Sequence, residues 1–284
     1  MSAPSLFRSV EGRRVAVVRD AAAVERVLAD DPVAACMVAA RVADHGLDPA
    51  SIGGEVWTRR RAEESLCYAG ANLIPLRGAP ADLRAFADQA LSGPRRCSSL
   101  VGPAELVLPM WERLERGWGP ARDVRARQPL MALRTAPRCV TDRAVRRVRV
   151  DELDAYLVAA VDMFIGEVGI DPRVGDGGRG YRRRVANLIA AGRAFARFEH
   201  GRVVFKAEIG SQSPAVGQIQ GVWVHPEWRG HGIGTAGTAS VASAVLGTGR
   251  IASLYVNSYN TVARAAYASV GFREVGTFAT VLLD

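Results

Sequence analysis

The chain has 284 residues, of which 49% are hydrophobic and 23% charged, with a formal net charge of +8. This composition is typical of a folded globular protein and too apolar for a disordered one, and the length allows two domains or one large one. The positive charge divides almost evenly between the halves without forming a basic stripe, so neither charge nor pattern indicates a nucleic-acid partner.

No apolar stretch is long enough for a membrane span, and the region around Glu11 and Arg13 does not resemble a secretory leader, so we expect a cytoplasmic protein without a membrane partner. The four cysteines lie far apart, without a C-x-x-C pair or a histidine at ligand spacing. We therefore expect reduced, mostly buried thiols and no metal site. Lys206 is the only lysine, and the richness in Arg and Ala is typical of high-GC bacterial coding.

The first half is predicted to form an α/β unit. In chain order its elements are a strand at 66–76, a helix at 81–91, a strand at 97–100, a helix at 104–116 and a strand at 129–133.

The second half is predicted to form a mixed α/β unit in a similar order. It begins with helices at 151–167 and 181–191 and a hairpin of 194–198 with 203–209. A buried strand at 216–224, a helix at 232–246, a strand at 251–256, a helix at 261–270 and two short strands around Gly276 within 272–283 follow.

This repeated order suggests a duplicated fold, with a domain at 1–140, a second at 145–284 and a connection near 136–144. The first copy lacks a glycine-rich turn: Leu76 to Pro80 stand in its place, and Trp111 stands roughly where the second half has Tyr267. Two unrelated α/β units are the alternative.

A glycine-rich turn, Arg229-Gly230-His231-Gly232-Ile233-Gly234, opens a predicted helix directly after a predicted strand. Glycines let the backbone approach a ligand closely, and the unpaired N–H groups of a helix's first turn suit a diphosphate. The turn lacks the G-K-[ST] of a P-loop, and no strand-borne acidic residue follows at the distance expected for a dinucleotide-binding fold.

The second half resembles the GNAT superfamily of N-acetyltransferases. The strand end Val224-His225-Pro226 followed by Arg229 to Gly234 matches the family's [QR]-x-x-G-x-[GA] signature. A second family pattern is matched by Val256, Asn257, Asn260, Ala263, Tyr267, Gly271 and Phe272. The resemblance covers about residues 145–284; the first half shows it only as architecture, and the whole arrangement resembles high-GC bacterial proteins with a family-specific N-terminal domain.

The resemblance implies a GNAT fold, as a tandem of a degenerate first domain and an intact second one, with acetyl-CoA as cosubstrate. In this family the strand equivalent to 216–224 bulges away from the one equivalent to 251–256, leaving a slot for pantetheine. The implied cofactor-binding residues are Val222, Trp223, Val224, Arg229, Gly230, His231, Gly232, Ile233, Gly234, Thr235, Asn260 and Tyr267.

The resemblance also implies catalytic roles. Tyr267 would be the general acid that protonates the departing thiolate, because a phenol with a pKa near 10 is protonated at neutral pH. A core tyrosine is the structural alternative. Asn260 would contact the cofactor, cap the following helix, or do both.

The general base is not determined. Many family members carry a glutamate at the positions that hold Gln218 and Tyr255 here. Glu208, Glu167 and a chain of water molecules are the candidates, whereas His225 and His231 are interpreted as turn residues. The acceptor pocket is expected between Met163 and Tyr181 and along the final strands.

These observations favour an acetyl-CoA-dependent N-acetyltransferase in which an unidentified amine attacks directly in a ternary complex. The alternative is a sensor or scaffold that binds CoA without turnover. Association with nucleic acid through the positive surface is a third, weaker hypothesis.

Overall fold

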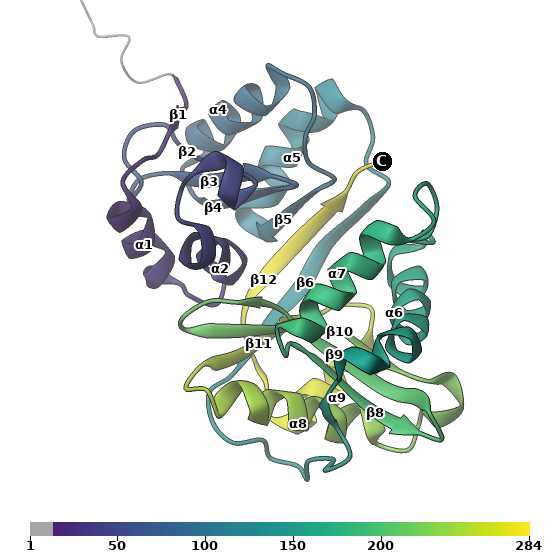
Figure 1. Cartoon of the computed structure of the whole chain (residues 1–284). Coiled ribbons are helices and arrows are strands. Elements are labelled where there is room, and N and C mark those ends of the chain that lie inside the picture. The colour runs from purple at the N-terminus through teal and green to yellow at the C-terminus, as the bar shows by residue number, and fades with distance from the viewer. Residues whose placement is uncertain (1–13) are drawn as a thin grey trace, which may run out of the picture. The chain divides into compact units, whose positions relative to one another are not determined.

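The computed structural model describes residues 14–284 and divides into two compact units (Figure 1). Of the described residues, the first comprises 14–128 together with Thr277–Asp284, and the second comprises Pro129–Gly276. The stretch with Glu11 and Arg13, used to argue against a leader, lies outside the described residues.

The first unit is a mixed sheet with helices. In chain order its elements are β1 (Ala16–Val17), α1 (Ala21–Asp30), α2 (Cys36–His45), α3 (Pro49–Ile52), β2 (Gly54–Thr58), β3 (Leu66–Gly70), β4 (Asn72–Arg77), α4 (Pro80–Leu91), β5 (Ser99–Pro103) and α5 (Ala104–Trp118). The start of β6 (Asp123–Leu133) and the end of β12 (Arg273–Leu282) complete it. The strands follow the order β1-β2-β3-β4-β5-β12, in which β4 and β5 run parallel.

Two predictions for the strands were wrong. The single strand expected at 66–76 is an antiparallel hairpin, because the chain reverses at Ala71 between β3 and β4. The two short strands expected around Gly276 are one continuous strand, β12, because Gly276 does not adopt a positive φ and the extended backbone continues through it.

The second unit contains β7 (Arg146–Arg147), α6 (Leu153–Val168), α7 (Arg179–Ala190), β8 (Ala194–Glu199), β9 (Arg202–Gln212), β10 (Val216–Val224), α8 (Ile233–Leu246), β11 (Ile251–Tyr255) and α9 (Thr261–Val270). Short 3₁₀ turns lie at Val150–Glu152 and Pro226–Trp228. Its strands follow the order β6-β11-β10-β9-β8-β7, and β10 runs parallel to β11, as β4 does to β5.

Each unit includes one strand from the opposite half of the sequence. Leu130 to Leu133, expected to close the first half, pair with β11 and lie in the second unit. Phe278 to Leu282 pair with β5 in the first unit.

Helices cover both faces of the second unit's sheet. Phe195 and Phe205 pack with α8 and α9, whereas Ala194 and Ala196 on the same hairpin pack with α6 and α7. Figure 1 shows the two helix pairs separately. Strand residues alternate between faces, so one hairpin supplies both cores.

The described residues also bear on the expected thiols, metals and membrane spans. Cys36, Cys67 and Cys97 are buried and Cys139 is half-buried, and all four are reduced. Among residues 14–284, no cluster of acidic, histidine and cysteine side chains could hold a metal ion. Nor is any helix in this part of the chain long and apolar enough to cross a membrane.

Candidate active site

Strand β10 bulges and separates from its parallel neighbour. Gln220 lies opposite Glu208 and Trp223 opposite Lys206, so two residues, Gly221 and Val222, face a single residue of β9. Gly221 has a φ of +58°, which glycine adopts without strain. The recorded pairing of β10 with β11 ends at Gln218, although β10 continues to Val224. The bulge and the separation are those that the family resemblance implies.

The glycine-rich turn presents the N-terminus of α8 to solvent. Gly230 and Gly232 have φ values of +80° and +75°, and a Cβ at either position would meet no atom within 4 Å. Gly232 is the N-cap, without a side-chain cap or an acidic residue in the first turn. The first recorded bond of the helix runs from the N–H of Ala236 to the carbonyl of Gly232, at 3.0 Å.

Two amides at the start of α8 are consequently available to a ligand. Within the described residues, no acceptor is recorded for the N–H groups of Gly234 and Thr235. Unsatisfied donors and the positive end of the helix dipole make such a terminus suitable for an anion. The geometry of this helix start therefore suits the diphosphate that the sequence predicts.

The N-cap of α9 and a tyrosine within this helix occupy different environments. Asn260 is exposed and caps the helix, because its Oδ1 accepts a hydrogen bond from the N–H of Ala263 at 3.1 Å. Tyr267 is buried, with 8% of its surface exposed, and its ring packs edge-on against Phe272. Burial, with a smaller contribution from the charge of Glu167, raises the pKa of Tyr267 well above its ordinary value, so the hydroxyl stays protonated at neutral pH.

Comparisons with known proteins agree with this architecture. Residues 206–281 match the family model of the FR47-like protein, and residues 54–156 match a domain of unknown function (DUF4081). A search of curated proteins gave no significant match.

Three solved structures cover almost the whole chain. An acetyltransferase of the GNAT family from Colwellia psychrerythraea is 11% identical, with a TM-score of 0.56, and the match covers 95% of this chain and 100% of that one. A tandem GNAT protein from the clavulanic acid biosynthesis pathway is 14% identical, with a TM-score of 0.52 and coverages of 95% and 97%. A Drosophila protein is 12% identical, with a TM-score of 0.67 and coverages of 96% and 99%.

The chain has the GNAT fold. The predicted resemblance to the GNAT superfamily and the predicted mixed α/β class are thereby confirmed. At these identities the similarity establishes the fold alone.

Glu208, one of the two candidate general bases, is a buried carboxylate in an ion pair. Its Oε1 accepts a hydrogen bond from Lys206 Nζ at 2.9 Å, and its Oε2 contacts Arg184 at 3.3 Å and Gln220 at 3.4 Å. Only 1% of Glu208 is exposed. Burial alone would raise the pKa of Glu208, but the charges of Lys206 and Arg184 outweigh it and hold the pKa below its ordinary value. Such a carboxylate is poorly suited to accept a proton.

Glu167, the other candidate, lies near the end of α6 and is exposed. Its charge contributes to the raised pKa of both Tyr267 and Tyr181. It thus lies close enough to both phenols to influence their ionisation. The pKa of Tyr181 is raised to about 12, chiefly by burial, and its hydroxyl donates to the carbonyl of Ala160 at 2.9 Å.

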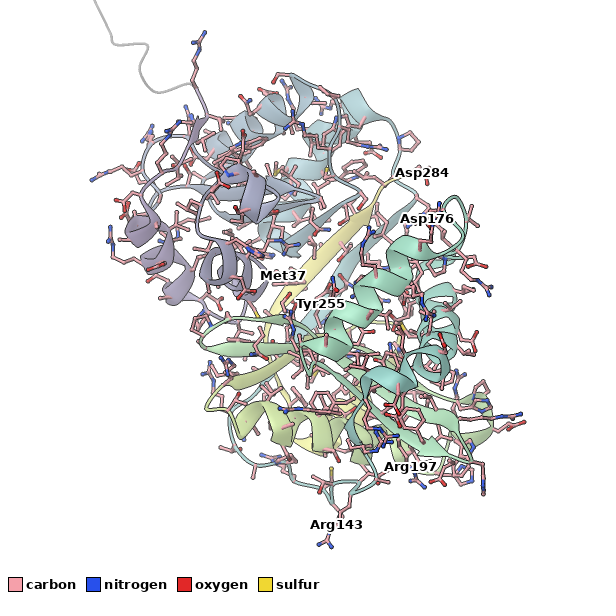
Figure 2. The ribbon with its side chains drawn as sticks, viewed as in Figure 1. Met37, Arg143, Asp176, Arg197, Tyr255 and Asp284 are labelled. Carbon is pink, nitrogen blue, oxygen red and sulfur yellow. The ribbon has the colours of Figure 1, made fainter. Side chains whose placement is uncertain are left out.

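The positions where many GNAT proteins carry a glutamate hold no carboxylate here. Gln218 is buried, and its Nε2 is without a hydrogen-bond partner among the described residues. Tyr255 is half-buried at the end of β11 and is labelled in Figure 2.

Sequence reasoning missed the support of the glycine-rich turn. Arg197 on β8, labelled in Figure 2, lies over the ring of Trp228 and contacts Asp142 at 3.1 Å. The N–H of Asp142 in turn donates to the carbonyl of Ala236 in α8 at 3.3 Å. The carbonyl of Asp142 accepts a hydrogen bond from the hydroxyl of Ser240 in the same helix at 2.9 Å. No local pattern marks these residues, since they are brought together only by folding.

Proposed function

We propose that the chain is an acetyl-CoA-dependent N-acetyltransferase that transfers an acetyl group to a primary amine by direct attack in a ternary complex. The observation that carries the proposal is the exposed, uncapped N-terminus of α8 directly after a bulged strand that has separated from its parallel neighbour. The GNAT-family acetyltransferase and the tandem GNAT protein among the similar structures support this function.

The backbone supplies the binding groups. We assign the amides of Gly230 to Thr235 to the diphosphate and the backbone of Val222 to Val224 to the pantetheine arm, with Asn260 at the cofactor's edge. The amide of Arg229, also expected there, is already used, because it donates to the carbonyl of Pro226 at 3.2 Å. One N–H of the bulged segment would donate to the thioester carbonyl, and such a donor contributes about 3 to 4 kcal/mol to transition-state stabilisation in well-studied sites.

Tyr267 is assigned as the general acid. The amine nitrogen forms a bond to the acetyl carbon, the C–S bond breaks, and Tyr267 gives its phenolic proton to the departing thiolate. The attacking nitrogen loses a proton as it becomes an amide, and this proton restores the phenol of Tyr267. The proton of the acceptor ammonium leaves to water or to Glu167, the exposed candidate whose charge acts on Tyr267. Glu208 is assigned no proton transfer, because its ion pair lowers its pKa and makes it a weak proton acceptor.

We also propose that the first domain, about residues 1–140, is a degenerate copy that holds no acetyl-CoA. Helix α4, which corresponds to α8, begins at Pro80, whose nitrogen carries no hydrogen. The carboxylate of Asp82 accepts a hydrogen bond from the N–H of Ala79 at 3.0 Å and pairs with Arg59. An acidic side chain therefore occupies the place where the second copy offers free amides.

A CoA sensor without turnover is the second candidate, because Gln218 and Tyr255 replace the family's usual glutamates.

Release of free CoA from acetyl-CoA, measured with a panel of primary amines, distinguishes the enzyme from the sensor. We expect turnover with at least one amine and a loss of about 10² to 10⁴ in kcat for Tyr267→Phe, with Tyr259→Phe, an exposed tyrosine nearby, as the control. Binding of acetyl-CoA without turnover on any amine would favour the sensor, and undiminished turnover of Tyr267→Phe would remove the assigned acid.

A further inference from the structure

The chain's only lysine is completely buried beside a buried glutamate. Lys206 is 0% and Glu208 1% exposed, and the Nζ of Lys206 lies 5.3 Å from the centre of the Tyr156 ring as well as 2.9 Å from Glu208. Replacing a buried ion pair by apolar residues of similar volume is often neutral or stabilising, so stability is a poor reason for such a pair. Its position indicates another role.

The two residues flank the bulge of β10. Lys206 lies opposite Trp223 and Glu208 opposite Gln220, so the bulged residues face the one residue that separates them on β9. Their side chains leave the same face of β9 and meet. The ion pair therefore spans the place where β10 gains its extra residue.

The pair also lies beside Gly221, a residue of the bulge. A Cβ at Gly221 would lie 3.1 Å from Lys206 Nζ, 3.1 Å from Met163 Cε and 3.6 Å from the carboxyl carbon of Glu208. The second oxygen of Glu208 contacts Gln220, the residue that precedes the bulge. A compact ammonium fits in this space, whereas the larger planar guanidinium of arginine would crowd Gly221. Apart from the histidines, every other basic side chain of the protein is an arginine.

We propose that Lys206 and Glu208 are positioning residues that fix the bulge of β10, and through it the backbone of Val222 to Val224 that faces acetyl-CoA. This inference rests on the proposed function for its catalytic consequence. The two side chains act through the main chain and touch neither substrate. Their removal changes the conformation of the bulge while the core stays packed.

The test is the double variant Lys206→Met/Glu208→Leu, which removes both charges and keeps a similar side-chain volume. Hydrogen exchange of the peptide 216–224, measured by mass spectrometry, should quicken by about tenfold at the bulge. Acetyl-CoA affinity should fall by about three- to tenfold and kcat by at least as much, at a melting temperature close to that of the parent chain. The matched control is Arg146→Met/Glu152→Leu, an ion pair of the same unit away from β10, which should leave exchange in this peptide unchanged.

Single variants separate an effect on the conformation of the bulge from an effect on the stability of the whole fold. Lys206→Met alone leaves Glu208 buried without its main partner and should lower the melting temperature as well, whereas Lys206→Arg should keep the charge but not the affinity. Gly221→Ala disturbs the bulge from the other side and should reproduce the faster exchange, which keeps the proposal testable should the double variant fail to fold.

Parent-like exchange at 216–224 in the double variant, or in Gly221→Ala, would overturn the proposal. If exchange quickens in the double variant but the parent chain has no acetyltransferase activity, the positioning role stands and the proposed function is refuted instead.

Discussion

The guanidinium of Arg197 lies over the indole ring of Trp228, with 5.6 Å between its central carbon and the ring centroid. The same guanidinium contacts Asp142 at 3.1 Å and Glu199 at 2.8 Å, so both ring and cation are held in place. Trp228 immediately precedes Arg229, where the glycine-rich turn begins. Arg197 therefore supports the turn from β8.

Arg197→Met should weaken acetyl-CoA binding by about three- to tenfold, because a cation–π contact contributes about 0.5 to 2 kcal/mol and its loss frees Trp228. Isothermal titration with acetyl-CoA measures the change. Arg202→Met, at an exposed position on the same hairpin, is the control and should bind like the parent chain. Equal affinity in both variants would mean that Trp228 does not position the turn.

Gly234→Trp should reduce acetyl-CoA affinity by about 100-fold or more, because an indole in the first turn of α8 would cover amides assigned to the diphosphate. A Cβ at this position already lies 3.3 Å from Val224. Gly247→Trp, at the other end of the same helix, should leave affinity unchanged. Binding that survives Gly234→Trp would show that the diphosphate lies elsewhere.

Asn260 offers a way to separate capping from ligand contact. Asn260→Ala should cost about 0.5 to 2 kcal/mol of stability, because the N–H of Ala263 loses its acceptor. Asn260→Asp keeps the cap and should retain the stability, while its negative charge weakens acetyl-CoA binding if the residue touches the cofactor. Denaturant unfolding and calorimetric titration of both variants measure the two roles, and parent-like affinity in both would leave capping as the only role.

The ion pair of Glu152 with Arg146 should make stability depend on acid pH. Hydrogen bonds from Arg146 lower the pKa of Glu152 to about 2, below its value in the unfolded chain. The stabilisation is therefore complete above about pH 4.5 and is lost as the pH falls towards 2.

Glu152→Gln should be less stable than the parent chain by about 1 to 2 kcal/mol at pH 7, a value reduced for the solvent around the half-exposed Arg146, and equal to it near pH 2. Denaturant unfolding at pH 7, 4 and 2.5 measures the difference. Glu25→Gln, at an exposed position on α1, is the control. A difference that stays constant with pH would contradict the ionic origin.

Much of the candidate site could be predicted because it is built from local signals. The strand at 216–224 and the helix at 261–270 occupy the predicted residues, and the glycine-rich turn opens a helix where its pattern indicates. Positive-φ glycines, an uncapped helix start and an asparagine N-cap depend on residues a few positions apart. Such features are present in the sequence before any folding is considered.

By itself, then, the sequence determined where the turn, its helix and Tyr267 lie along the chain. Only the tertiary structure decided that Leu130 to Leu133 pair with β11, that Phe278 to Leu282 pair with β5, and that Lys206 meets Glu208 opposite the bulge. Strand partners and register are set by contacts between distant segments, and the hydrophobic pattern of one strand does not specify its neighbour. The buried ion pair follows from that register, which is why Glu208 could be predicted as a base and is found bound to a lysine.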